Sequence, residues 1–202
     1  PLHYPAFDKI SDSDYAPAFD RGMAEHLREV AAITANPAAP TFDNTIIALE
    51  KSGDVLQRTS TVFFSLSGVE NNDALKKLQA EYAPKLAAHR DAITLDPALF
   101  TRIQKLYDAR ASLGLDAQSV RLIERYHTDF VRAGARLSDA DKAHLKQING
   151  ELARLGTKFT QNVLAEVNDS ALVVDSRAEL AGLTDAQIDA AAAAAKAKGL
   201  DG

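Results

Sequence analysis

Cysteine is absent from this chain of 202 residues. Without thiols, the chain forms no disulfide, no thiolate nucleophile, no iron–sulfur cluster and no cysteine-ligated zinc site. A cysteine-free composition is compatible with a reducing cytoplasm. The absence thus removes several classes of enzyme and metal protein from consideration.

Long hydrophobic runs and excess positive charge are also missing. The longest apolar run is the six alanines Ala190 to Ala195, whereas a membrane span needs about 20 residues. The first residues carry neither a basic start nor an apolar stretch, so we expect no signal peptide. Lys and Arg number 23 against 28 Asp and Glu, for a net charge of −5. We therefore expect neither a membrane nor a nucleic acid as a partner.

The overall composition predicts a folded helical chain. The composition is 46% hydrophobic and 25% charged, which is typical of globular domains rather than disordered ones. Glycine and proline are sparse, at 10 and 7, and fall mostly where helices should begin or end. We predict an all-α fold, a bundle of about seven helices in one domain over residues 1–202.

Start and stop signals divide the N-terminal half of the chain into segments. Residues 1–13 predict an extended strap, and a first helix should run from Asp14 to Thr34. The two prolines in residues 36–41 break the chain. Apolar residues then recur at helical spacing and predict one long helix interrupted only by Gly53: Phe42, Ile46, Leu49, Leu56, Phe63 and Leu66.

Three further helices follow from start and stop signals. Asn72 is a candidate N-cap before a helix that includes Leu75, Leu78, Tyr82, Leu86 and Ile93. Asp96-Pro97 begins another helix, which should end at Gly114. A helix over residues 117–136 should turn Val120, Ile123, Phe130 and Leu137 inward.

The cleanest pattern lies behind Ser138, a predicted N-cap. An apolar row recurs every three or four residues and predicts a long amphipathic helix that needs neighbours on its apolar side: Leu145, Ile148, Leu152, Leu155, Phe159, Val163 and Val167. The β-branched run at 171–174 predicts a short strand whose partner lies outside the chain. Thr184 and Gln187 form a capping box for a last helix that ends at Gly199.

A search for catalytic and metal-binding motifs assigns no site. None of His3, His26, His89, His127 and His144 is followed by Glu, so no His-Glu-x-x-His zinc helix is present. Glu124 and His127 form one Glu-x-x-His pair, but di-iron bundles need two such pairs. His144 lies between lysines as a phosphotransfer candidate. The row Arg121, Arg125, Arg132 and Arg136 is interpreted as a solvated face paired with Glu124 and Asp129, with a substrate-carboxylate contact as the alternative.

Several segments carry a resemblance to a known family. Residues 15–23 (Tyr-Ala-Pro-Ala-Phe-Asp-Arg-Gly-Met) and 36–50 (Asn-Pro-Ala-Ala-Pro-Thr-Phe-Asp-Asn-Thr-Ile-Ile-Ala-Leu-Glu) resemble the N-terminal region of thimet-oligopeptidase-like zinc metallopeptidases. Residues 112–115, 130–135, 172–174 and 179–183 are similar to the bacterial peptidyl-dipeptidase, or dipeptidyl carboxypeptidase, branch. The resemblance runs from Leu2 to the last residue.

This resemblance implies a longer cytoplasmic bacterial enzyme, monomeric, that hydrolyses short peptides and releases C-terminal dipeptides. Its zinc would be held by two histidines of His-Glu-x-x-His and a downstream glutamate, all outside residues 1–202. The present segment would form a wall and part of the roof of a deep channel, restrict entry by size, bind no zinc itself, and have the catalytic domain as its partner. The alternatives are a stand-alone helical interaction or scaffold module and a histidine phosphotransfer bundle. The first interpretation predicts a broad exposed apolar face near the end of the chain.

Overall fold

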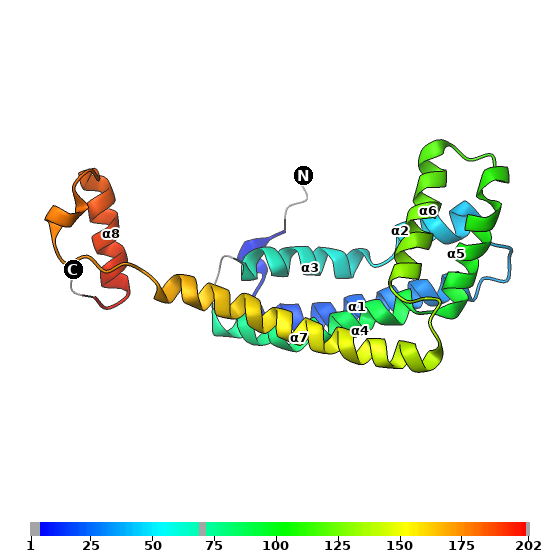
Figure 1. Cartoon of the computed structure of the whole chain (residues 1–202), viewed down its shortest axis with the longest axis horizontal. Helices are drawn as coiled ribbons and strands as arrows, with labels where there is room; N and C mark the ends of the chain where they lie inside the picture. The colour runs from blue at the N-terminus through cyan, green and yellow to red at the C-terminus, as the bar shows by residue number, and fades with distance from the viewer. Residues whose placement is uncertain (1–4, 69–71, 201–202) are drawn as a thin grey trace. The chain divides into compact units, whose positions relative to one another are not determined.

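The computed structural model describes residues 5–68 and 72–200, and for residues 167–169 the backbone alone. The predicted all-α class is confirmed: within the described residues there are seven α-helices longer than one turn and no strand (Figure 1). They are α1 Asp12–Thr34, α3 Asp54–Ser67, α4 Asp73–Thr94, α5 Pro97–Ala109, α6 Ala117–Arg132, α7 Asp139–Asp169 and α8 Asp185–Ala197, with a three-residue α2, Ala48–Glu50. The chain divides into two compact units, residues 1–159 and 160–202.

The helix starts agree closely with the sequence signals. In each predicted cap, a side-chain oxygen accepts a hydrogen bond from the backbone N–H three residues later, which satisfies one of the donors that a helix leaves free. For example, Asp96 accepts from Leu99 at 2.7 Å, and Pro97 occupies the first helical position. The same pattern holds at Asn72, Ser138 and Thr184.

The prediction of one long helix from residue 41 onward is wrong, because a turn at Gly53 separates two helical segments. A π-helix over Phe42–Ile47 leads into α2, and α3 starts anew at Asp54. Gly53 has a φ of +74°, a conformation that costs little only for glycine. Its N–H donates to the Glu29 carboxylate at 2.7 Å, and a Cβ there would lie 2.8 Å from Nδ1 of His26. A tertiary contact with α1 therefore fixes a turn where periodicity predicts a helix.

Three smaller predictions also need correction. The strap contains a 3-10 helix, Phe7–Lys9, and α1 begins at Asp12. The helix predicted over 117–136 ends at Arg132, because Gly134 has a φ of +99°, and Leu137 is exposed. Residues 171–174 form no strand. Leu172 there is 89% exposed, and Val174 lies with Ile188 of α8 in the lining of one pocket.

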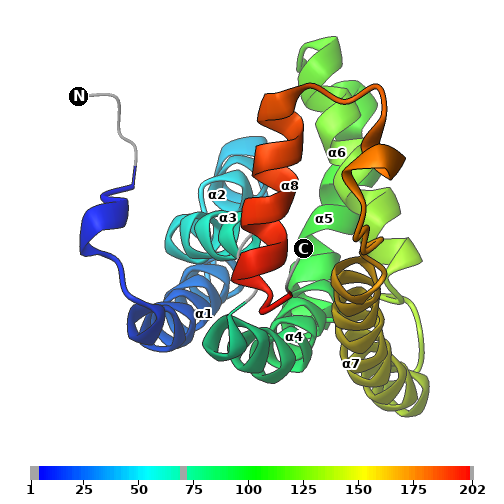
Figure 2. The ribbon, with the colours of Figure 1, turned by 90° about the vertical axis from the view of Figure 1, so that its left-hand side faces the viewer.

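One core cluster joins α1, α3 and α4, which lie side by side in Figures 1 and 2. Its centre is aromatic: Phe63 meets Tyr15 and Phe19 edge to face, with ring centroids 5.1 and 5.2 Å apart. Phe19 also stacks on Tyr82, whose hydroxyl donates to the backbone oxygen of Ala16 at 3.0 Å. Such pairs add to the free energy gained by burial.

A second cluster is mainly aliphatic, with Phe130 as its buried aromatic member, and links the ends of α1 and α4 to α5 and α6. Ile103 and Ile123 are fully buried where α5 and α6 pack together, and Ile46 from the π-helix closes the cluster. The two clusters together give α1 and α3–α6 a packed framework.

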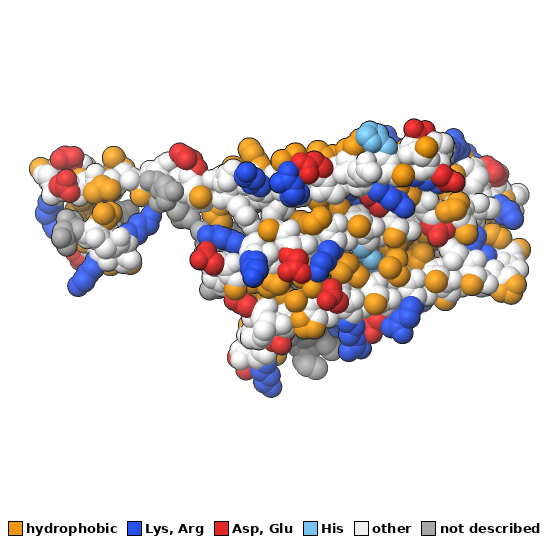
Figure 3. Space-filling view, turned by 90° about the horizontal axis from the view of Figure 1, so that it is seen from below, with side chains coloured by type: hydrophobic (Ala, Val, Ile, Leu, Met, Phe, Trp, Pro, Cys, Tyr) orange, Lys and Arg blue, Asp and Glu red, His pale blue; other side chains and the backbone are white. Residues whose placement is uncertain are grey.

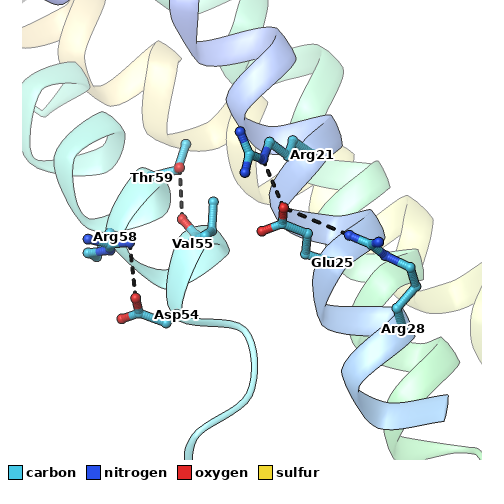
Figure 4. Close-up of polar contacts among 7 residues, drawn as sticks. All are labelled: Arg21, Glu25, Arg28, Asp54, Val55, Arg58 and Thr59. Atoms are coloured by element: carbon cyan, nitrogen blue, oxygen red, sulfur yellow. Dashed lines mark hydrogen bonds and ion pairs between the residues drawn. The ribbon is translucent and has the colours of Figure 1, made fainter. Parts of the chain in front are cut away.

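Three ion pairs on α1 and α3 each join residues of the same helix (Figure 4). On α1, Glu25 contacts Arg21 at 2.8 Å and Arg28 at 3.8 Å, and on α3 Arg58 contacts Asp54 at 3.0 Å. None of the contacts drawn joins one helix to the other. Exposed pairs of this kind contribute little to stability. The aromatic cluster and the close approach of Gly22 to Leu56 are the contacts that join α1 to α3.

Candidate interaction surface on α7

The apolar row of α7 is exposed to solvent rather than packed. Ile148, Leu152, Leu155 and Phe159 all expose large parts of their side chains, Leu152 60% and Phe159 69%. At roughly 100° per residue, these four side chains occupy an arc of about 60° on one side of the helix. Leu145 is half-buried, Val163 in the second unit is exposed, and the side chain of Val167 lies outside the described residues.

The part of α7 that faces the helical framework lies about 90–170° from the centre of this row and carries polar or small side chains. Asn149 donates from Nδ2 to the buried Asp91 on α4 at 2.8 Å, and Lys142 donates from Nζ to the Leu95 carbonyl at 3.2 Å. Ala153 and Thr157 on this side are partly shielded. The helix therefore contacts the framework mainly through this polar flank and through Leu145 next to Gly134, while the apolar side chains from Ile148 to Phe159 face solvent.

Figure 3 shows the molecule from below the view of Figure 1, so that the lower side, where α4 and α7 lie, faces the reader. Hydrophobic side chains are exposed there between lysine, arginine and acidic ones. An exposed apolar patch with a polar rim is typical of a surface that another structural element covers. α7 therefore carries an exposed apolar face near the end of the chain.

The Glu124 and His127 pair is held apart by separate partners. The Glu124 carboxylate accepts from Nε of Arg110 at 3.2 Å. The His127 ring stacks on Tyr107, with centroids 3.8 Å apart, and its Nε2 lies 3.2 Å from a guanidinium nitrogen of Arg136. Burial, and secondarily the Arg136 charge, lower the pKa of His127. The surroundings thus favour a neutral imidazole in a packed cluster.

The other candidates lie in ordinary surface positions. Arg121 pairs with Glu124 at 3.4 Å and Arg125 with Asp129 at 3.0 Å, as the solvated-face interpretation predicts. Arg136 instead joins the His127 cluster. His144 is exposed on α7.

Arg102 is a buried residue that the sequence reasoning missed. Its guanidinium donates to the carbonyls of Asn36 and Ala38 at 3.0 and 3.2 Å, and to the side chains of Asn44 and Thr45 at 2.9 and 3.3 Å. All four acceptors belong to the 36–50 motif that carries the family resemblance. Arg102 therefore fixes the shape of that motif, and nothing in its own neighbourhood of the sequence signals this role.

A second missed feature is a histidine pair between α1 and α4. Nε2 of His89 lies 3.0 Å from Nδ1 of His26, although the two residues are 63 positions apart. Nδ1 of His89 is buried and has no hydrogen-bond partner among the described residues. Burial is the main cause that lowers the pKa of both imidazoles. The pair is built to remain neutral.

Within the described residues, no three His, Asp or Glu side chains are grouped so that they could hold a metal ion. None of the helices in the described part combines the length and the hydropathy needed to cross a bilayer.

Comparison with known proteins gives clear relatives. The chain is 45% identical over 201 residues, all of its length, to "Dipeptidyl carboxypeptidase" of Escherichia coli, and 44% identical to that of Salmonella typhimurium. It is 26% identical over 202 residues to "Oligopeptidase A" of Escherichia coli. In each case it spans only 30% of the relative. No family model matches. The resemblance predicted from the motifs is confirmed: the chain is similar along its whole length to an N-terminal segment of thimet-oligopeptidase-like peptidases.

Proposed function

We propose that this chain is the non-catalytic N-terminal helical part of a longer zinc metallopeptidase that hydrolyses short peptides and releases C-terminal dipeptides in the bacterial cytoplasm. The observation that carries the proposal is the 45% identity over the whole chain to a dipeptidyl carboxypeptidase of which the chain spans 30%. The rest of that length is available to supply the reacting groups.

Zinc would be held by residues outside this chain. The sequence contains no His-Glu-x-x-His, and no described group of three acidic or histidine side chains offers a ligand set. When bound in the longer protein, zinc would supply an activated water and polarise the peptide carbonyl. The residues of this chain do not fit the metal and take no part in that step.

The role of the chain would be steric. Its two core clusters hold α1 and α3–α6 in a packed framework, and close packing resists deformation. A rigid helical wall beside a reaction centre admits extended peptides and keeps folded proteins out. Such a role needs buried apolar side chains rather than reactive ones, and the two core clusters supply them.

The experiment measures how the longer polypeptide cleaves different peptide and protein substrates. We expect dipeptide release from short peptides with a free C-terminus, no release when the C-terminus is amidated, and no cleavage of a folded protein. Residues 1–202 alone should retain no stoichiometric zinc and release no dipeptide. Sustained turnover by residues 1–202 alone, or equal turnover of the amidated peptide, would contradict the proposal.

A further inference from the structure

The outward row of α7 has no occupant within the described residues 5–159. Asp91 of α4 and Leu95, which directly follows α4, contact α7 through Asn149 and Lys142, about 90° and 110° from the centre of the row. Those polar contacts hold the helix without using Leu152 or Phe159, which are among its most exposed side chains. Four large apolar side chains are thus exposed within an arc of about 60° on the helix surface. A surface that stays in contact with water does not explain this grouping.

We propose that Ile148, Leu152, Leu155 and Phe159 form a docking face for an apolar helix surface from the remainder of the same polypeptide. The inference rests on the proposed function, because that function supplies the remainder. The relatives are matched over only 30% of their length, so more than two thirds of each lies outside the matched segment. This is the nearest source of a partner, and covalent linkage to the face gives it a high effective concentration.

The chemistry of the face defines what fits it. Its centre is purely aliphatic and aromatic, and the residues at 3- and 4-residue spacing form ridges that match another helix. Glu151 lies beside the row and is already paired with Arg154 on the same helix, so it does not demand a cation from the partner. An apolar helix face with a neutral polar rim satisfies these conditions.

Thiol labelling in the longer polypeptide tests the assignment, and residues 1–202 bring no cysteine of their own to confuse it. The test variant is Leu152→Cys. The matched control is Gln147→Cys, which is also exposed on α7 but lies roughly 110° from the centre of the row. Labelling of each peptide is followed by mass spectrometry in native buffer and normalised to its rate in denaturant.

The docking face predicts that the thiol at 152 labels at least about tenfold more slowly than the thiol at 147. Equal labelling would overturn the proposal. Slow labelling at 152 that becomes fast on dilution would mean that a second copy covers the face, and would overturn it as well. The measurement needs no activity, so an inactive polypeptide with a protected thiol at 152 would refute the proposed function and leave the docking face standing.

Discussion

The aromatic cluster of α1, α3 and α4 and the apolar row of α7 come from the same kind of sequence pattern and have opposite fates. Phe63 and Phe159 both lie on helical apolar stripes, yet Phe63 is 0% exposed and Phe159 is 69% exposed. Periodicity identifies which side chains share a face of a helix. It does not tell which face of a helix meets which neighbour, or whether that neighbour belongs to the described residues.

The largest expected contrast compares these two phenylalanines in the 202-residue chain. Phe63→Ala leaves a cavity among several rings and should cost about 3–5 kcal/mol of unfolding free energy. Phe159→Ala removes an exposed ring and should cost under about 1 kcal/mol. Urea denaturation of both variants gives the two values, and similar costs would show that the row of α7 is buried.

Arginines offer the next contrast, between a buried and an exposed guanidinium. Arg102→Lys keeps the charge but cannot satisfy four acceptors in the 36–50 motif, so it should cost about 2–3 kcal/mol. Arg125→Lys, at an exposed ion pair with Asp129, should change stability by less than about 0.5 kcal/mol. The same denaturation assay measures both, and a harmless Arg102→Lys would remove the proposed role of Arg102.

The third contrast is between two glycines, one in a left-handed turn and one inside a helix. Gly53→Ala forces an alanine into a left-handed turn against His26 and should destabilise the chain by about 1–2 kcal/mol. Gly150→Ala on α7, where a Cβ would meet no atom within 4 Å, should stabilise it by about 0.5–1 kcal/mol. Shifts of melting temperature in opposite directions are expected, and a shift in the same direction for both would contradict the assigned geometries.

The smallest effect is a dependence on pH. The folded-state pKa values of His26, His89 and His127 are lowered from the ordinary 6.5, so below that pH the unfolded chain binds more protons than the folded one. Stability should therefore be full above pH 6.5 and fall as the pH drops below it. An extra proton on the His26–His89 pair also requires an N–H at the buried Nδ1 of His89, if the contact between the rings is kept.

The midpoints of urea denaturation at pH 7.5 and 5.5 measure the slope of stability against pH. His89→Gln should reduce the loss at pH 5.5, whereas His144→Gln, which removes an exposed imidazole, serves as the control. An unchanged slope in His89→Gln would show that the pair is not responsible.

Local signals predicted the helical class and the starts of α4, α5, α7 and α8, because a cap such as Asp96 or Asn72 acts within three residues of itself. The break at Gly53 was not predictable, since it depends on Glu29 and His26 from another helix. The same holds for Arg102 and for the histidine pair, whose partners are distant in sequence. The outward direction of the α7 row depends on Asn149 and Lys142, two polar contacts that no apolar pattern reveals.

The most direct test of the account is Leu152→Asp, measured in both contexts. In the 202-residue chain this substitution should change the unfolding free energy by less than about 1 kcal/mol, because the side chain is already in water. In the longer polypeptide it would place an unpaired charge in the docked face, and dipeptide release should fall by at least about tenfold. Wild-type release by the longer variant, or a large loss of stability in the short chain, would contradict the account.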